Sequence, residues 1–187
     1  MKNIVLVCML MLFLPNAQSA EMAGVKLPDE VSLPGASAPL VLNGFGIRKK
    51  FFFKVYLASL YLPERLSNAQ KIIDSDTPKR VQMDMLYSKV EKEKFIEGWN
   101  EGFAANQTAD ALAPLQARLN SFNEMFEDLV EGDQVQLDYL PSQGTIVRIK
   151  GVEKGVIPGR DFNQALLRIW LGDAPVTDSL KKALLGG

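Results

Sequence analysis

The chain has 187 residues, of which 47% are hydrophobic, and a formal net charge of -1. This balance shows neither the basic excess of a nucleic-acid-binding protein nor a polybasic membrane patch, so we expect no nucleic-acid partner. The sequence contains no histidine and one cysteine, Cys8. Ordinary zinc sites and catalytic groups built on histidine are therefore excluded, and we expect no metal and no cofactor. Any chemistry has to use Arg, Lys, Tyr, Asp, Glu, Asn or backbone groups.

The first 20 residues have the pattern of a secretory signal peptide. Lys2 supplies the positive charge, residues 4–14 form a short apolar run, and small residues follow at 17–20. We expect cleavage after Ser19 or Ala20, which leaves a single domain at 21–187 in the periplasm or secreted from the cell. No second long apolar run follows, so we expect no transmembrane segment in the mature chain.

The stretch from Leu40 to Leu62 is rich in β-branched and aromatic residues and contains no proline. This composition predicts two strands or one long bent strand. Gly44 and Gly46 interrupt its first half. They indicate a turn, a bulge or a close approach of another backbone.

A basic triplet, Arg48, Lys49 and Lys50, follows these glycines. Because side chains alternate along a strand, Arg48 and Lys50 are expected on one face and Lys49 on the other. One or two cations would then lie at the edge of an apolar core, where they could bind an anion. The alternative is that all three side chains face water at the end of a strand.

The rest of the chain alternates between groups of strands and groups of helices. Residues 79–86 alternate apolar and polar side chains, as in a half-buried strand. Apolar spacing predicts helices at 91–105 and 112–130, and we expect Trp99 and Phe122 to be buried against the sheet. Further elements are a hairpin at 134–140 and 145–150, a strand within 151–158, a helix capped by Asp161 and a last helix capped by Asp178. This order predicts an α+β fold with helices on one face of a largely antiparallel sheet.

Three motifs resemble the chalcone isomerase-like superfamily, in its bacterial exported branch. They are residues 42–50 (LNGFGIRKK), residues 55–62 (VYLASLYL) and residues 169–175 (IWLGDAP). The resemblance extends from about Val25 to the C-terminus. It implies an open-faced β-sandwich, in which a layer of helices covers a large antiparallel sheet and a ligand cleft lies between them. Plant members of this family cyclise chalcones, and other members bind fatty acids.

The resemblance implies only part of the family's site. Arg48 matches the substrate-facing arginine, and Tyr87 matches the active-site tyrosine. Tyr56 and Ile169 align with the two active-site threonines of the enzymes. The asparagine of the enzymes has no counterpart near Lys94. The arginine and a phenol are thus retained, while most groups that would stabilise a developing enolate are replaced.

The retained groups suit an amphipathic carboxylate. A guanidinium binds a carboxylate in bidentate fashion, and a phenol donates one more hydrogen bond. We therefore expect non-catalytic binding of a fatty acid or a similar molecule by Arg48, Tyr87 and Tyr56. The expected apolar walls are Phe51, Phe53, Trp99, Phe103 and Ile169.

Two alternatives remain open at this stage. One is an isomerase or intramolecular lyase acting on a non-flavonoid substrate, because Arg48 and Tyr87 could polarise an enone. The other is a structural or interaction module of the cell envelope, which would show an exposed apolar patch and no enclosed pocket.

Overall fold

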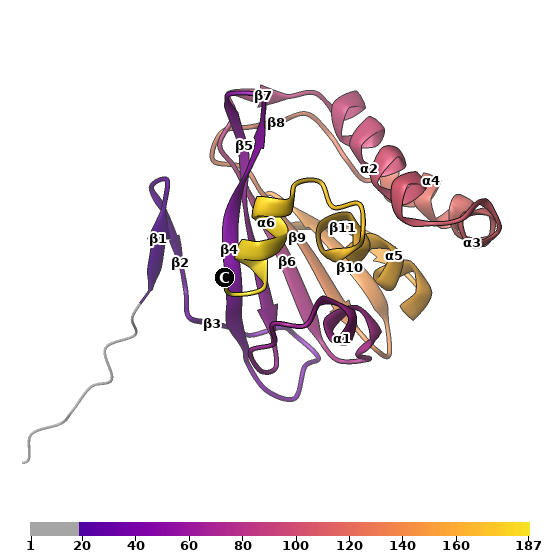
Figure 1. The fold of residues 1–187 in the computed structure, drawn as a ribbon, viewed down its shortest axis with the longest axis horizontal. Coiled ribbons are helices and arrows are strands. Elements are labelled where there is room, and N and C mark those ends of the chain that lie inside the picture. The colour runs from indigo at the N-terminus through magenta and orange to yellow at the C-terminus, as the bar shows by residue number, and fades with distance from the viewer. Residues whose placement is uncertain (1–18) are drawn as a thin grey trace, which may run out of the picture.

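The computed structural model describes residues 19–187 and contains one large sheet with helices packed on it (Figure 1). The predicted signal peptide lies outside the described residues, except for its last two positions, Ser19 and Ala20. Ala20 is the first residue of strand β1. No helix within 19–187 combines the length and the apolar character that crossing a membrane requires.

The large sheet has seven strands in the order β11–β10–β9–β6–β5–β4–β3, and all neighbouring strands are antiparallel. Two short ribbons accompany it, one formed by β1 and β2 and one by β7 and β8. The strands are β1 Ala20–Met22, β2 Val25–Leu27, β3 Glu30–Val31, β4 Leu40–Lys50, β5 Phe53–Leu62, β6 Lys79–Met85, β7 Lys89–Val90, β8 Leu129–Val130, β9 Gln134–Leu140, β10 Gly144–Ile149 and β11 Val152–Ile157. The predicted antiparallel sheet and α+β class are confirmed.

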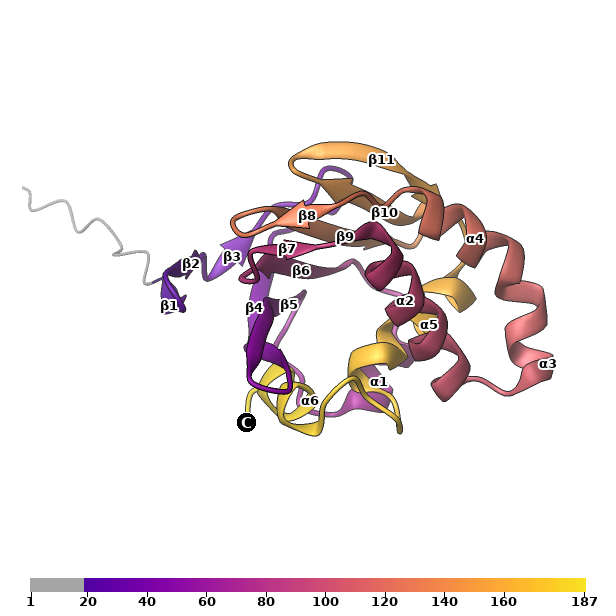
Figure 2. The same cartoon turned by 90° about the horizontal axis from the view of Figure 1, so that it is seen from above.

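The helices gather on the concave side of the sheet, which curls around α5 and α6 (Figure 2). They are α1 Ala69–Asp74, α2 Lys92–Asn106, α3 Ala109–Leu112, α4 Gln116–Glu124, α5 Arg160–Leu171 and α6 Asp178–Leu184, with a 3₁₀ turn at Ala113–Leu115. Trp99 and Phe122 lie in the core between helices and sheet, as predicted, with their rings edge to face at 5.4 Å. On the other face of the sheet, Leu27 of β2 and Leu33 form a second core cluster with Leu57, Tyr61 and Leu140 of the sheet.

The two glycines of β4 allow α6 to lie directly on the strand. A side chain at Gly44 would come within 2.3 Å of the Ala183 carbonyl oxygen, and one at Gly46 within 2.7 Å of the Ala183 Cβ atom. The neighbouring Asn43 donates hydrogen bonds to the Leu184 and Leu66 carbonyl oxygens. Of the possibilities that the sequence left open for these glycines, two are observed: another backbone approaches closely, and the register shifts between Leu42 and Gly44, as at a β-bulge or a similar irregularity.

Some predicted helix boundaries are wrong. The predicted helix 112–130 begins at the last residue of α3, continues through a 3₁₀ turn that contains Pro114, and is α-helical again only in α4, because proline has no N–H group to continue an α-helix. Its last two residues, 129 and 130, form β8 instead. Helix α5 is preceded by Gly159 at its N-cap, while Asp161 lies inside the first turn and pairs with Arg118. Thr177, rather than Asp178, caps α6.

Candidate functional site

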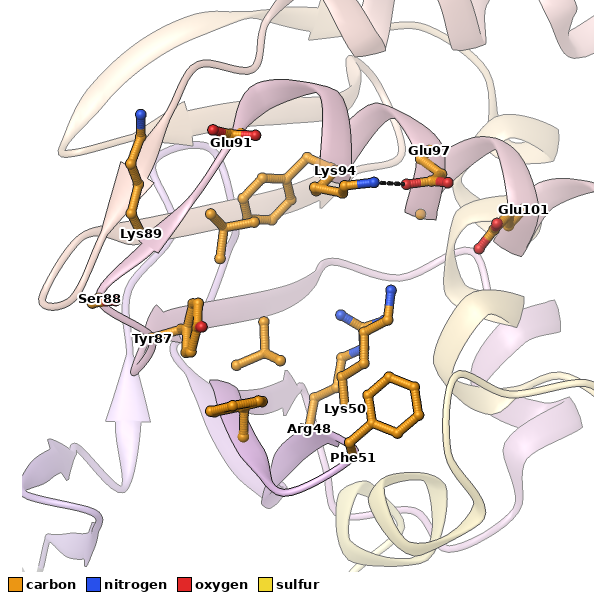
Figure 3. A pocket seen from close by; sticks show the side chains of 15 residues that line it. Arg48, Lys50, Phe51, Tyr87, Ser88, Lys89, Glu91, Lys94, Glu97 and Glu101 are labelled. Carbon is orange, nitrogen blue, oxygen red and sulfur yellow. Dashed lines mark hydrogen bonds and ion pairs between the residues drawn. The ribbon is translucent and has the colours of Figure 1, made fainter.

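A cavity of about 480 Å³ opens between the β4–β5 hairpin, the chain that leaves β6, and helix α2. Its volume lies within the range of roughly 300–1,000 Å³ that is usual for small-molecule sites. Figure 3 shows Arg48, Lys50 and Phe51 on one side, Tyr87 on a second side, and Glu97 and Glu101 across the space. We call this space the outer cavity. Its lining is Arg48, Lys50, Phe51, Phe53, Val55, Tyr87, Ser88, Lys89, Val90, Glu91, Lys94, Phe95, Glu97, Gly98 and Glu101.

A second cavity, of about 40 Å³, shares several lining residues with the outer cavity and lies among more deeply buried side chains. We call it the inner cavity. Its volume is about three times what a single water requires, which is enough for a small polar group. It is lined by Arg48, Tyr56, Lys94, Phe95, Gly98, Trp99, Ile169 and Val176. Arg48 lines both cavities, so its side chain lies where they meet.

Arg48 has few partners for a charged side chain that is half-buried. It lies on β4 opposite Tyr56 of β5, and its guanidinium carbon is 5.6 Å from the centre of the Tyr56 ring. Its Nε atom is buried and has no hydrogen-bond partner. Among residues 19–187, no Asp or Glu forms an ion pair with it. Within the described residues, the face of the Tyr56 ring is thus the group that interacts with the guanidinium.

Tyr56 is fixed below Arg48 by a hydrogen bond within the core. Its hydroxyl oxygen accepts from Trp170 Nε1 at 3.0 Å, and the whole side chain is buried. Burial raises the pKa of the Tyr56 phenol, and the nearby positive charge of Arg48 offsets part of that rise. The phenol therefore stays protonated at neutral pH, and its proton is available for donation to a ligand.

Tyr87 lies on the wall of the outer cavity, just after β6. Its backbone N–H donates to the Val55 carbonyl oxygen at 3.2 Å, and its ring meets the edge of Phe53 at 5.4 Å. Arg48 and Tyr87 thus face the same space without a hydrogen bond between them (Figure 3). A ligand in the outer cavity could contact both residues.

Helix α2 supplies the opposite wall. The sequence predicted Trp99 and Phe103 of this helix as wall residues, but not the five that line the outer cavity, which are Lys94, Phe95, Glu97, Gly98 and Glu101. Lys94 Nζ lies 2.8 Å from Glu97 Oε2, and this hydrogen bond lowers the pKa of the Glu97 carboxyl. Gly98 lines both cavities, and a Cβ atom added there would meet no atom within 4 Å. These residues could have been found from the sequence. Lys94, Gly98 and Glu101 have helical spacing, and each directly precedes a residue of the apolar stripe, so they lie on the helix face beside it.

The predicted wall residues divide among three places. Phe51 and Phe53 line the outer cavity, and Trp99 and Ile169 line the inner one. Phe103 lines neither cavity, so its assignment is corrected. It is fully buried against Phe162, at 5.3 Å between ring centres, because one more helical turn carries it past the end of the cavities and under α5.

The site is made of one arginine, two phenols, amine and carboxylate groups at the rim, and apolar walls. Among the described residues, no group of three His, Cys, Asp or Glu side chains is arranged to hold a metal ion. The chemistry that these groups offer is the binding of an anionic head through Arg48 and its phenol neighbours, next to an apolar space.

The model of the chalcone isomerase-like family matches residues 19–186. The chain belongs to the chalcone isomerase-like family. None of the curated proteins compared with it matches its sequence significantly. Among solved structures, it is similar to a fatty-acid binding protein of Arabidopsis thaliana, with a TM-score of 0.71 and 16% sequence identity over 90% of this chain and 96% of that one. At this identity the likeness shows a shared fold.

Proposed function

We propose that the protein binds an amphipathic carboxylate of the fatty-acid class and does not transform it. The observation that carries this proposal is the state of Arg48. Its side chain is half-buried at the junction of the two cavities, its Nε atom is buried without a hydrogen-bond partner, and no carboxylate of the described residues pairs with it.

The head group of the ligand belongs beside Arg48. A charge that is withdrawn from water costs several kcal/mol unless an opposite charge and hydrogen bonds compensate it. A ligand carboxylate supplies both, through parallel hydrogen bonds to the guanidinium. The inner cavity has room for such a group, and the Tyr56 phenol borders it.

The apolar chain of the ligand belongs in the outer cavity. Its buried apolar walls are Val55 and Phe95, while Phe53 and Glu101, which also line it, are exposed and lie toward its mouth. Burial of apolar area contributes about 25 cal/mol per Å², so a longer chain binds more tightly until the cavity is full. This predicts that affinity rises with chain length and then levels off.

The family relationship gives independent support. A chalcone isomerase-like fold is shared with a plant protein that binds fatty acids, and the cavity here lies between sheet and helices, where the family resemblance places a ligand. The positions that align with the threonines of the enzymes hold Tyr56 and Ile169. Because Ile169 has no hydrogen-bond donor in its side chain, the site is better suited to binding than to stabilising an enolate.

Native mass spectrometry of the purified protein tests this proposal. We expect a co-purified lipid, and added long-chain fatty acid should raise the melting temperature, since a ligand at 100 times its Kd adds about 2.7 kcal/mol to stability. Arg48→Ala should lose both effects. Lys54→Ala is the matched control, because Lys54 is a cation of the same hairpin that lines neither cavity. No lipid and no thermal shift in the wild-type protein would refute the proposal.

We also propose that the protein is exported to the periplasm or secreted, as residues 1–20 predict. The test is N-terminal sequencing of the protein recovered from the periplasmic and culture fractions. A chain that starts at Ala20 or Glu21 supports export, and a chain that starts at Met1 and stays in the cytoplasmic fraction contradicts it.

A further inference from the structure

The tip of the β4–β5 hairpin exposes three consecutive aromatic side chains. Phe51, Phe52 and Phe53 are 85%, 98% and 55% exposed. Large apolar side chains are normally buried, and a contiguous exposed group of them marks a contact surface. They account for three of the six large hydrophobic side chains that are exposed within residues 19–187, and they are adjacent along the chain. We call Lys49 to Lys54 the aromatic tip.

The backbone of the aromatic tip adds a second observation. Phe51 has a φ of 55°, in the left-handed region that glycine adopts at least cost. The other two hairpin turns with a non-glycine residue in this region, Ala23–Gly24 and Lys150–Gly151, each contain a glycine. The aromatic tip places a phenylalanine at the strained position and has no glycine beside it. Strain of this kind is concentrated at functional sites, so the side chains at this turn require an explanation beyond folding.

The charges of the aromatic tip are also unbalanced. Lys49 of β4 lies directly opposite Lys54 of β5, and both side chains are exposed. Like charges directly opposite each other destabilise a strand pair. Among the described residues, neither lysine forms an ion pair with an Asp or Glu. An anionic surface in contact with the tip would neutralise both.

We propose that the aromatic tip docks on an anionic lipid bilayer. The three phenylalanines enter the boundary between head groups and acyl chains, and Lys49 and Lys54 contact the phosphate groups of the lipids. A bilayer satisfies the exposed rings and the unpaired charges together, whereas an apolar groove on a protein would satisfy only the rings. Because Lys50, Phe51 and Phe53 also line the outer cavity, docking places the cavity mouth at the membrane surface.

The test uses the wild-type protein and vesicles without added fatty acid, so that its outcome does not depend on ligand binding. The protein should float with vesicles of equal parts phosphatidylcholine and phosphatidylglycerol, and much less with phosphatidylcholine alone. Neutralising Lys49 and Lys54 with K49Q and K54Q should weaken binding by about fivefold for each charge. Phe52→Ser should also lower binding without touching either cavity, since Phe52 lines neither.

A fluorescent variant reports directly on the tip. Trp99 and Trp170 are both buried, so a tryptophan introduced by Phe52→Trp is the only one that solvent or lipid can reach in residues 19–187. Its emission should move to shorter wavelength when anionic vesicles are added. Val152→Trp is the matched control, at a 57% exposed residue beside another hairpin turn, and it should show no change.

Two results would overturn the proposal. One is a wild-type protein that stays free of anionic vesicles while the Phe52→Trp emission is unchanged, which would assign the exposed rings to a protein interface. The other is an equal shift of the emission wavelength in Phe52→Trp and Val152→Trp, which would mean that the vesicles do not bind the aromatic tip specifically.

Discussion

Two arginines on strands of the same sheet have opposite surroundings. Arg80 of β6 is buried and holds Asp138 through two hydrogen bonds, from Nε at 2.6 Å and from an Nη atom at 2.7 Å. Arg148 donates to the same carboxylate at 2.7 Å. Arg48 of β4 faces two cavities, and within residues 19–187 it has neither a carboxylate partner nor a hydrogen bond at its buried Nε atom.

The difference in surroundings indicates that Arg80 stabilises the fold and that Arg48 is available to bind a ligand. Arg80 forms its ion pair with a carboxylate of the fold, so its charge is compensated without a ligand. Arg48 is positioned by β4 and by the Tyr56 ring. Its guanidinium can still form paired hydrogen bonds with the carboxylate of a ligand. The comparison therefore predicts that removing the Arg80 partner harms stability, whereas removing Arg48 harms binding.

The largest effect is expected at Asp138. Asp138→Ala leaves Arg80 buried without its carboxylate, and breaking a buried pair in this way costs about 3–5 kcal/mol. Urea denaturation measures the loss. Asp161→Ala is the matched control, because the Asp161–Arg118 pair is also bidentate but more exposed and should contribute at most about 1 kcal/mol. Equal losses in the two variants would contradict the distinction between buried and exposed pairs.

A second prediction separates binding from stability at Gly98. Gly98→Ala should stabilise α2 by about 0.5–1 kcal/mol, because glycine is a poor helix former and the added methyl group meets no atom. Gly98→Leu should keep part of this gain but fill the space where the cavities join, and fatty-acid binding should fall sharply. Thermal unfolding and a binding titration on the same samples measure both effects. Undiminished binding by Gly98→Leu would show that the ligand lies elsewhere.

A third prediction concerns the pH dependence of stability and rests on Lys79, another buried cation. It is 1% exposed, and Nζ donates to the Ser75 and Thr77 carbonyl oxygens. Burial lowers the pKa of Lys79 to about 8. Between this value and the usual 10.5, the unfolded chain binds a proton that the folded chain has lost, so the contribution of Lys79 to stability rises with pH.

The measurement is the free energy of unfolding between about pH 8 and 10, where the slope from this lysine can approach about 1.4 kcal/mol per pH unit. Above pH 10, Tyr61 acts in the opposite direction, because burial raises the pKa of its phenol to about 12 and the folded chain then keeps a proton that the unfolded chain loses. Lys79→Met should remove the rise below pH 10, and the exposed Lys182→Met should keep it. A wild-type slope in Lys79→Met would assign the rise to another group.

Much of the fold could be predicted from local patterns. The alternation at 79–85 and the apolar stripe of 92–106 correspond to β6 and α2, because each pattern has a clear period. The expectation that this strand is half-buried is wrong. All seven residues of β6 are buried, and polar side chains among them find partners on the sheet, as Arg80 does with Asp138. The segment 112–130 was mistaken for one helix, since its apolar residues keep helical spacing across Pro114 and into β8. The spacing of apolar residues does not show where helical hydrogen bonds end and pairing with another strand begins.

The site could be predicted only in part. The family resemblance pointed to Arg48, Tyr56 and Tyr87, and all three line the cavities. Trp99 of α2 was predicted and lines the inner cavity, but Gly98 and Glu101 of the same helix were not predicted, and Phe103 lies outside both cavities. Which face of a helix borders a cavity depends on its rotation and depth against the sheet, and tertiary packing decides both. Phe51 and Phe53 of the aromatic tip were expected to form a cavity wall, and the sequence could not show that both rings are also exposed.

The most direct test of the binding role of Arg48 compares two ligands that differ only in the head group, decanoate and decanol, by calorimetric titration. The wild-type protein should prefer decanoate by about 10- to 100-fold, the difference expected for hydrogen bonds to a charged group. Arg48→Ala should bind both ligands equally and weakly with unchanged or slightly higher stability, and Arg48→Lys should recover part of the preference. A preference for decanoate that persists in Arg48→Ala would contradict the account.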